Sequence, residues 1–299
     1  KNNGNFEEIS WQDAYKKIKE KILKTSPDKI VGLTGDMTNM ETMFAVKNLF
    51  QKTLNSSYLD SRAKHTYINF ENRSNYLFNS GIEGIEESDL ILLIGTNPRF
   101  EATILNSRIR KTYLKNKTEI FSLEDVGDLT YPYKVLENNS KVIDKIIKNE
   151  HNLSNKIASA EKPIIILGQS ILNSNNGAYI FEEFKKYLTK INKIDDNWNA
   201  LNILSTDASA VGSYDLGIFS SNDGSNKALK KIEDGDVEVI FLLGQDNLKI
   251  KKNNEFIIYI GSHGDNGADM ADLILPGAAY TEQDGYFTNL EGKLQKAYK

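Results

Sequence analysis

The sequence predicts an α/β fold in which doubly wound, mostly parallel sheets form two lobes. Three observations support this prediction. Apolar runs that end in glycine and a polar loop recur along the chain, helical patterns lie between them, and 299 residues are more than one core usually needs. Strands that alternate with helices form right-handed βαβ units, which build doubly wound sheets.

Five segments are predicted as buried strands. Their apolar residues are continuous and rich in Ile and Val, which is typical of strands covered on both faces. Each run ends in a glycine and a polar loop, and ligands of such sheets bind at these carboxyl ends. In chain order the segments are Ile30–Asp36, Leu90–Pro98, Ile164–Ser170, Val239–Asn247 and Phe256–Asn266.

Four helices are predicted, one before the first strand and three between strands. Ser10–Thr25 places Trp11, Ile18 and Ile22 on one face, and the Ser10 side chain can cap its first turn. The segment Asp195–Asp223 mixes helix and turn signals, so no element is assigned to it. The other predicted helices are Met40–Leu54, Glu101–Lys115 and Ala178–Ile191.

We expect the boundary between the two lobes in Asp128–Asn139, where a proline and several polar residues interrupt the pattern. The first α/β lobe is then residues 1–135. The second is residues 136–299 and includes the C-terminal segment ILPGAAYTE.

Composition excludes several function classes. The net charge of -4, from 37 basic and 41 acidic residues, creates no strong field for nucleic acid or anionic lipid. No apolar run approaches the ~20 residues of a membrane span. The sequence has no cysteine, so it offers no thiolate for an ordinary iron–sulfur cluster. Because the first residues lack a Met and a signal-peptide core, we expect an interior fragment cut at both ends.

One strand-to-helix turn has the chemistry of an anion site. Gly95 lets backbone approach a ligand, and Thr96 and Asn97 supply side-chain hydrogen bonds. Pro98 and Arg99 open the following helix, whose free N–H groups suit a diphosphate. The same residues also describe an ordinary helix entry, with Asn97 as the cap and Pro98 in the first turn. Chemistry alone favours this simpler interpretation.

Other cofactor motifs are weak or absent. No Gly-x-Gly-x-x-Gly opens a helix after a predicted strand, and no Walker A sequence occurs. His263, Asp265, Asp269 and Asp272 follow one predicted strand and could ligate a divalent cation. A solvated acidic loop is the simpler interpretation, so we predict no metal site.

The stretch Ala271–Gln295 concentrates residues that determine backbone shape. A short apolar strand at its start runs into Pro276–Gly277, which end the strand and turn the chain. Glu282, Asp284 and Glu291 could form general acid/base pairs. No nucleophile–base arrangement accompanies them, so we predict no catalytic residue.

Together these segments resemble the molybdopterin oxidoreductases, and more closely the large iron–sulfur subunit (the 75 kDa or G type) of respiratory complex I. The resemblance runs from Ile9 to Gln295, and the opening ISWQDA is shared with molybdopterin oxidoreductases in general. Lys293 stands where the family usually has Arg, which puts a bidentate contact there in doubt. The segments that resemble the complex I subunit specifically are RSNYLFN (Arg73–Asn79), IGTNPRFEA (Ile94–Ala102), NSRIRK (Asn106–Lys111), DLTY (Asp128–Tyr131) and ILPGAAYTE (Ile274–Glu282).

This resemblance implies a molybdopterin oxidoreductase-like fold and an architectural role in NADH:ubiquinone oxidoreductase. The domain would support electron transfer from NADH to quinone without holding a redox centre, and Gly95, Thr96, Asn97, Pro98 and Arg99 would be vestiges of a cofactor site. The 2Fe–2S and 4Fe–4S clusters would belong to an amino-terminal part of the subunit. The implied partners are other peripheral-arm subunits, with no nucleic acid and no membrane insertion. The implied location is the cytoplasmic face of a bacterial inner membrane or the matrix face of the mitochondrial one.

Two alternatives stay open. The first is an active molybdopterin-dependent oxidoreductase of the formate dehydrogenase or nitrate reductase kind, although such enzymes usually need a Cys, selenocysteine, Ser or Asp ligand and no Cys is present. The second is a stand-alone nucleotide-binding module that uses the turn Gly95–Arg99.

Overall fold

The computed structural model describes residues 5–137, 141–263 and 266–299. It divides into two compact units, each built around its own parallel sheet. Unit 1 comprises Lys1–His65, Asp207–Asn289 and Leu294–Lys299, and unit 2 comprises Thr66–Thr206 and Leu290–Lys293. This division differs from the expected consecutive lobes 1–135 and 136–299. The reason is that the chain leaves the first sheet after two strands, builds the second sheet, and then returns to complete the first.

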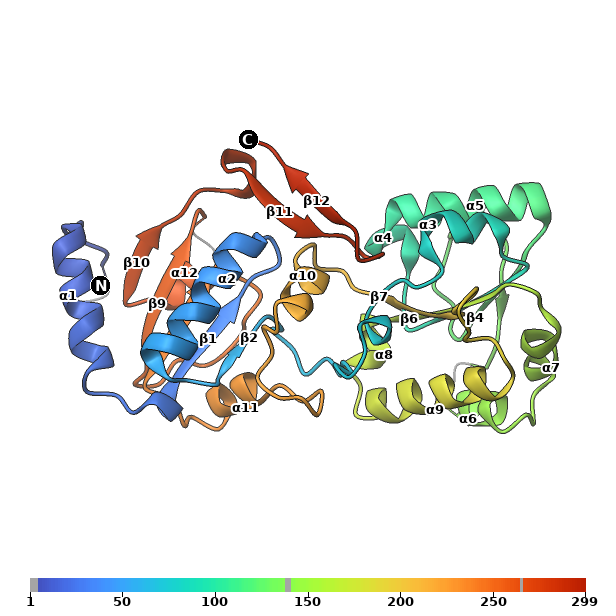
Figure 1. Ribbon diagram of the computed structural model, residues 1–299, viewed down its shortest axis with the longest axis horizontal. Helices are drawn as coiled ribbons and strands as arrows, with labels where there is room; N and C mark the ends of the chain where they lie inside the picture. Colours follow the sequence, from blue (N-terminus) through green and yellow to red (C-terminus); the bar gives the residue numbers. More distant parts are fainter. Residues whose placement is uncertain (1–4, 138–140, 264–265) are drawn as a thin grey trace. The chain divides into compact units, whose positions relative to one another are not determined.

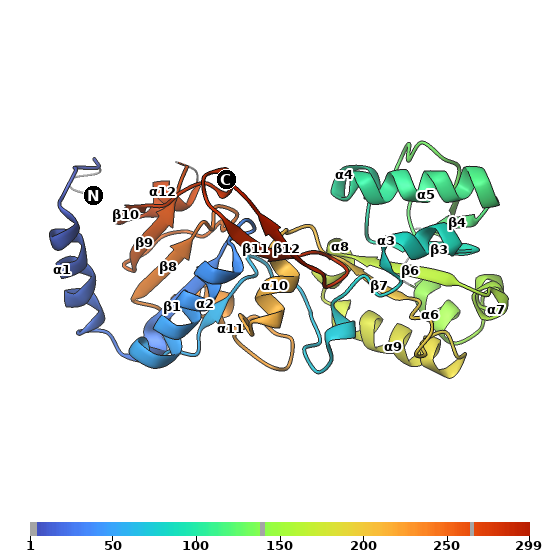
Figure 2. The ribbon, with the colours of Figure 1, turned by 45° about the horizontal axis from the view of Figure 1, so that its top comes forward.

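The sheet of unit 1 has five parallel strands in the order β10-β9-β8-β1-β2 (Figures 1 and 2, with β8 labelled in Figure 2). Counted within the unit, this is the 2-1-3-4-5 order of one common doubly wound arrangement. Every residue of β1 and β8 is buried, as their continuous apolar runs predict. The strands are β1 (Ile30–Thr34), β2 (Leu59–Asp60), β8 (Val239–Leu243), β9 (Phe256–Gly261) and β10 (Leu273–Pro276).

Helices cover both faces of this sheet. On one face α1 and α2 bring Ala14 and Met43 against Phe241, and on the other α11 brings Leu229 against Ile240. A π-helical turn, Leu49–Leu54, continues α2 to the end of the predicted helix. The helices are α1 (Trp11–Ile22), α2 (Met40–Asn48), α10 (Ala210–Asp215), α11 (Lys227–Glu233) and α12 (Asn266–Met270).

The sheet of unit 2 also has five parallel strands, in the order β5-β4-β3-β6-β7. Within the unit this is the order 3-2-1-4-5, the other common doubly wound arrangement. The strands are β3 (Leu90–Ile94), β4 (Glu119–Ser122), β5 (Lys134–Val135), β6 (Pro163–Gly168) and β7 (Leu201–Leu204). The prediction of an α/β fold with parallel sheets is confirmed.

Helices of unit 2 also lie on both faces of their sheet, α5 on one side and α6 and α9 on the other (Figures 1 and 2). Ile109 of α5 packs with Ile91 and Leu93, whereas Phe184 of α9 packs with Leu92. The helices are α3 (Gly81–Gly84), α4 (Pro98–Glu101), α5 (Thr103–Asn116), α6 (Lys141–Ile147), α7 (Asn152–Ser159), α8 (Gln169–Leu172) and α9 (Gly177–Lys190).

Local sequence explains where two predicted helices begin. The Ser10 side chain accepts a hydrogen bond from the Asp13 N–H at 3.1 Å, so the predicted cap of α1 is confirmed. The helix predicted as Glu101–Lys115 starts later, at Thr103, because Ala102 has φ -152 and separates α5 from the short helix α4.

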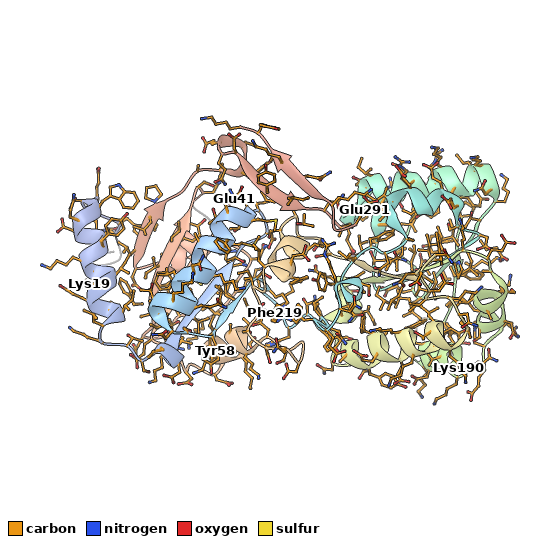
Figure 3. All side chains as sticks on the ribbon, viewed as in Figure 1. Lys19, Glu41, Tyr58, Lys190, Phe219 and Glu291 are labelled. Atoms are coloured by element: carbon orange, nitrogen blue, oxygen red, sulfur yellow. The ribbon has the colours of Figure 1, made fainter. Side chains whose placement is uncertain are left out.

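The chain ends in an antiparallel hairpin of β11 (Gly285–Thr288) and β12 (Leu294–Ala297). The Tyr286 N–H donates to the Glu41 carboxylate at 3.0 Å (Glu41 is labelled in Figure 3), which ties β11 to α2 within unit 1. The turn Leu290–Lys293 belongs to unit 2. No helix in the described ranges is long and apolar enough to cross a membrane.

Candidate functional site

Each sheet has one point at which the strand order reverses, and ligands of open α/β sheets bind at the carboxyl ends of the strands there. In unit 1 this point lies between β1 and β8, and in unit 2 it lies between β3 and β6. Glycines stand at all four strand ends: Gly35, Gly244, Gly95 and Gly168.

In unit 2 the turn after β3 packs tightly against the end of β6. Gly95 has φ +64, and a Cβ there would lie 2.6 Å from the Cβ of Ile171. A Cβ at Gly168 would lie 2.2 Å from the carbonyl oxygen of Gly95. The Ser170 hydroxyl donates to that same oxygen at 2.6 Å. Glycine is therefore required at both positions because two turns of the chain meet, and the chain itself fills the space.

The chain's own Glu101 occupies the hydrogen-bond donors of this turn. The Thr96 hydroxyl donates to one carboxylate oxygen at 2.6 Å, and the Asn97 N–H donates to the other at 3.1 Å. Asn97 also caps α4, since its side-chain oxygen accepts from the Arg99 N–H at 3.2 Å. Its amide group donates to the Val126 carbonyl at 2.8 Å. A diphosphate at this turn would have to displace the Glu101 carboxylate.

Arg99 fastens the turn to the segment that follows β4. Its guanidinium donates to the Asp128 carbonyl at 2.6 Å and to the Asp128 carboxylate at 2.7 Å. The Thr130 N–H and then Arg99 lower the pKa of Asp128. The five residues singled out in the sequence, Gly95 to Arg99, thus lie together, and the contacts given above join them to other residues of unit 2.

In unit 1 the corresponding point opens into a cavity of about 360 Å³. Here too two glycines meet, because a Cβ at Gly35 would lie 1.7 Å from the carbonyl oxygen of Gly244. The Thr38 hydroxyl donates to the Leu243 carbonyl at 3.2 Å, which holds the loop after β1 to the end of β8. Residues from the ends of four strands line the cavity, among them Thr38, Asn39, Gly244, Asp246, Gly261, His263 and Gly277.

Carboxylates gather beside this cavity. Burial, and then the charge of Asp207, raise the pKa of Asp36 to about 6. The Asn247 amide donates to the Asp36 carboxylate, and the charge of Lys64 also favours its ionised form. The Asp246 carboxylate adds to the repulsion. Sequence reasoning missed Asp36, because an aspartate after a glycine-terminated strand gives no sign of its neighbours.

The residues after β9 do not assemble a metal site in what the structure describes. His263 is exposed, and Asp265 lies outside the described residues. Asp272 pairs with Lys252 at 2.7 Å and accepts the Ile257 N–H at 2.9 Å. Across the described ranges, no group of three His, Asp or Glu side chains is placed to hold a metal ion.

A buried ion pair in unit 1 was also missed by sequence reasoning. Asp60 and Arg62 have side chains that are 0% and 3% exposed, and their charged groups lie 2.7 Å apart. Arg62 also donates to the Gly224 carbonyl at 2.7 Å. Asp60 accepts from the Ser220 N–H at 2.9 Å and from its hydroxyl at 2.7 Å. The pair therefore connects β2 to the loop before α11, and these contacts indicate a structural role.

The three carboxylates of the C-terminal stretch serve local structure. Glu282 accepts the Ala279 N–H at 2.9 Å, and Asp284 accepts the Lys299 N–H at 3.1 Å. Glu291, labelled in Figure 3, accepts the Ile82 N–H at the start of α3 at 2.6 Å and pairs with Lys293 at 2.9 Å. Each carboxylate thus has its own backbone partner, as expected of loop residues.

Comparison with known proteins identifies the family to which this chain is similar. The family model described as molybdopterin oxidoreductase matches residues 1–299. The chain is 38% identical over 298 residues to the G subunit of the NADH-quinone oxidoreductase of Rickettsia bellii (strain RML369-C), covering 99% of this chain and 42% of that protein. It is 37% identical over 310 residues to the NADH-ubiquinone oxidoreductase 75 kDa subunit of Reclinomonas americana, covering 99% of this chain and 44% of that protein.

A more distant mitochondrial relative is the NADH-ubiquinone oxidoreductase 78 kDa subunit of Candida albicans, 35% identical over 99% of this chain and 40% of its own length. Among solved structures, acetylene hydratase from Pelobacter acetylenicus matches 97% of this chain and 55% of its own, with a TM-score of 0.49 and 14% identity. The chain thus spans about two fifths of the length of the curated relatives it matches.

Proposed function

This chain belongs to the molybdopterin oxidoreductase family, and from that premise we propose that it is a scaffold domain of the large iron–sulfur subunit of an NADH–quinone oxidoreductase, respiratory complex I. Its two units would hold the subunit's cluster-bearing part and neighbouring subunits in place, and would take no electron themselves.

The curated relatives support the choice of this complex. Their names describe subunits of NADH-quinone or NADH-ubiquinone oxidoreductases, and the similarity to them runs through 99% of this chain. Because the chain spans about two fifths of their length, NADH oxidation and quinone reduction are assigned to the rest of the assembly as part of the proposal.

The main support for a scaffold role is that Glu101 occupies the hydrogen-bond donors of the turn Gly95–Arg99. The molybdopterin cofactor implied by the family does not fit the turn Gly95–Arg99, because the Glu101 carboxylate already accepts from Thr96 and Asn97. A second carboxylate-bearing residue, Asp128, pairs with Arg99. A phosphate brought to these donors would meet the repulsion of the Glu101 carboxylate, while Asp128 neutralises the Arg99 charge that would otherwise attract it. We therefore assign no reaction step to that cofactor.

The remaining assignments follow from the same proposal. The iron–sulfur clusters would lie in other parts of the subunit, since this chain contains no cysteine to ligate them. The partners would be other subunits of the peripheral arm. The location would be the cytoplasmic face of a bacterial inner membrane or the matrix face of a mitochondrial one.

The test uses the full-length subunit in its assembled complex and two kinds of variant. Ile166→Asp puts a carboxylate into a fully buried position of β6, so unit 2 should unfold and the yield of assembled complex should fall. Asp246→Asn changes the wall of the unit 1 cavity, and NADH–quinone turnover per assembled complex should stay the same. Ile166→Val is the matched control for the buried position, and it should assemble normally.

Two results would overturn the proposal. One is a drop of about tenfold or more in turnover per assembled complex for Asp246→Asn, which would place chemistry in the cavity. The other is stoichiometric molybdenum with bound pterin in the purified complex, which would favour an active molybdopterin oxidoreductase.

A further inference from the structure

The outward face of α4 and α5 exposes large apolar side chains. Phe100 is 80% exposed, Ile104 is 72% exposed and Leu114 is 52% exposed. The opposite side of α5 is already packed, since Leu105 and Ile109 are buried against the sheet of unit 2. The exposed apolar side chains therefore do not belong to the hydrophobic core of unit 2.

Ile104 and Leu114 are the two ends of a row of exposed positions along one side of α5. On α5 the outward positions Ile104, Ser107, Lys111 and Leu114 follow one another at intervals of three, four and three residues. This is the alternation with which one helix receives the side chains of another. Phe100 is also exposed, on the short helix α4, which Ala102 separates from α5, so helical spacing does not relate it to Ile104. A single exposed apolar residue needs no explanation, but Ile104 and Leu114 on one side of α5, with Phe100 just before that helix, indicate a contact surface.

The charged residues of α4 and α5 are mostly basic, which favours an acidic partner. From Arg99 to Lys117 the chain has six basic residues and one acidic residue, whereas the whole chain has a net charge of -4. The single acidic residue, Glu101, turns inward to Thr96 and Asn97. Two carboxylates neutralise part of this charge, since Glu86 pairs with Arg108 and Lys111 and Asp128 pairs with Arg99. The basic residues are Arg99, Arg108, Arg110, Lys111, Lys115 and Lys117.

We propose that the outward face of α4–α5 binds an acidic amphipathic helix of a neighbouring subunit, through Phe100, Ile104 and Leu114. The partner helix carries apolar residues at the same three–four spacing, with Asp or Glu beside them. This inference rests on the proposed function, because it requires that the chain work inside a multi-subunit complex.

Other occupants fit the face less well. A second copy of this chain would bring two basic faces together, and like charges oppose association. A membrane surface would need a continuous apolar face, yet Ser107 and Lys111 stand between Ile104 and Leu114. Nucleic acid would be attracted by the basic residues, but it offers nothing that packs against an aliphatic seam.

Photo-crosslinking in the intact complex tests the inference. The probe is benzoylphenylalanine, placed at position 104 or 107 of the full-length subunit, and mass spectrometry identifies the linked peptide. The matched control places the same probe at Tyr179, which is 49% exposed on α9, the helix that lies across the sheet from α5 and ends at Lys190 (Figure 3). We expect positions 104 and 107 to link to one helix of a different subunit, rich in Asp and Glu, and position 179 not to link to it.

A pair of variants gives a second measurement. Ile104→Ser with Leu114→Ser should lower the amount of subunit recovered in the complex by about tenfold or more, with Tyr179→Ser as the control. The thermal midpoint of the isolated protein should change little, since both side chains are exposed. Lys115→Glu should weaken assembly and make it less sensitive to salt.

The outcomes separate this inference from the proposed function. If the subunit enters the complex but positions 104 and 107 link to nothing, to a second copy of this chain, to lipid or to nucleic acid, the docking face is wrong and the proposed function stands. If the subunit does not enter an NADH–quinone oxidoreductase at all, the proposed function fails and the inference fails with it.

Discussion

Glu101 shows how one side chain changes the meaning of a motif. The turn Gly95–Arg99 has the residues of an anion site, and sequence reasoning located it correctly at the end of a strand and the start of a helix. The sequence could not indicate which group would occupy its donors. Glu101 stands four residues after Asn97, a position that usually indicates only a favourable charge in the first helical turn.

Replacing Glu101 should therefore destabilise unit 2. In Glu101→Ala the Thr96 hydroxyl and the Asn97 N–H lose their acceptor, and we expect the free energy of unfolding to fall by about 1–3 kcal/mol. Glu101→Gln keeps one oxygen and should lose less. Urea titration followed by circular dichroism measures both, and Glu150→Ala, at an exposed glutamate, is the control. Equal losses for Glu101→Ala and Glu150→Ala would contradict this account.

Asp36 should make unit 1 less stable as the pH rises. Its pKa in the folded protein is about 6, above the ordinary value of 3.8, so between these values the folded state binds more protons than the unfolded state. The stability associated with neutral Asp36 is therefore complete below about pH 4 and is lost as the pH passes about 6. The carboxyl is partly exposed, so solvent screening limits the effect to about 1 kcal/mol.

The variant Asp36→Asn should remove this dependence. It stays neutral and can still accept from Asn247, so it should be more stable than the natural protein at pH 7.5 and about equal to it at pH 4. Denaturant unfolding at the two pH values measures the difference. A variant that is less stable at pH 7.5 would mean that Lys64 and Asn247 outweigh the burial and the repulsion from Asp207 and Asp246.

At the scale of elements, the buried pair Asp60–Arg62 fixes a two-residue strand to a loop more than 150 residues away. Arg62→Met leaves the Asp60 carboxylate buried without its partner, and we expect a loss of about 3–5 kcal/mol in the free energy of unfolding. The double variant Asp60→Leu with Arg62→Met should lose less than the single one, because no charge stays buried. The exposed pair Lys29–Glu238 provides the control, and Lys29→Met should have no resolvable effect. A double variant worse than Arg62→Met would show that the hydrogen bonds to Ser220 matter more than the charge.

The success of sequence reasoning differed between kinds of element. Strands of five mostly apolar residues, such as β1, β3 and β8, were predicted, since burial on both faces leaves a nearly continuous apolar run. The strands β2, β4 and β7 were missed because they are two to four residues long and include Asp60, Glu119 and Asn202. The hairpin β11–β12 was missed because its turn residues were interpreted as loop chemistry.

At the scale of the whole molecule, the order of the strands within each sheet could not be predicted from the sequence pattern. The expected lobes cut the chain at one polar segment, whereas the two units interleave at residues 65–66, 206–207, 289–290 and 293–294. Composition marks a polar segment such as 128–137, but a polar loop inside a unit has the same composition as a linker between units. β1 pairs with β8, more than 200 residues away, and no local sequence pattern predicts such a long-range pairing.

This interleaving predicts which fragments fold. A fragment of residues 66–206 contains all five strands of the unit 2 sheet, so it should unfold cooperatively as a monomer. A fragment of residues 1–135 contains β1 without its neighbour β8 and β3 without its neighbour β6, so two central strands would have an unpaired, apolar edge. We expect this fragment to aggregate or to show no cooperative transition. Calorimetry and size-exclusion chromatography of these two fragments and of a fragment of residues 136–299 provide the measurement. Cooperative folding of 1–135 and of 136–299 would contradict the interleaved division, because each half would then form its own core without the strands that the structure pairs across the cut.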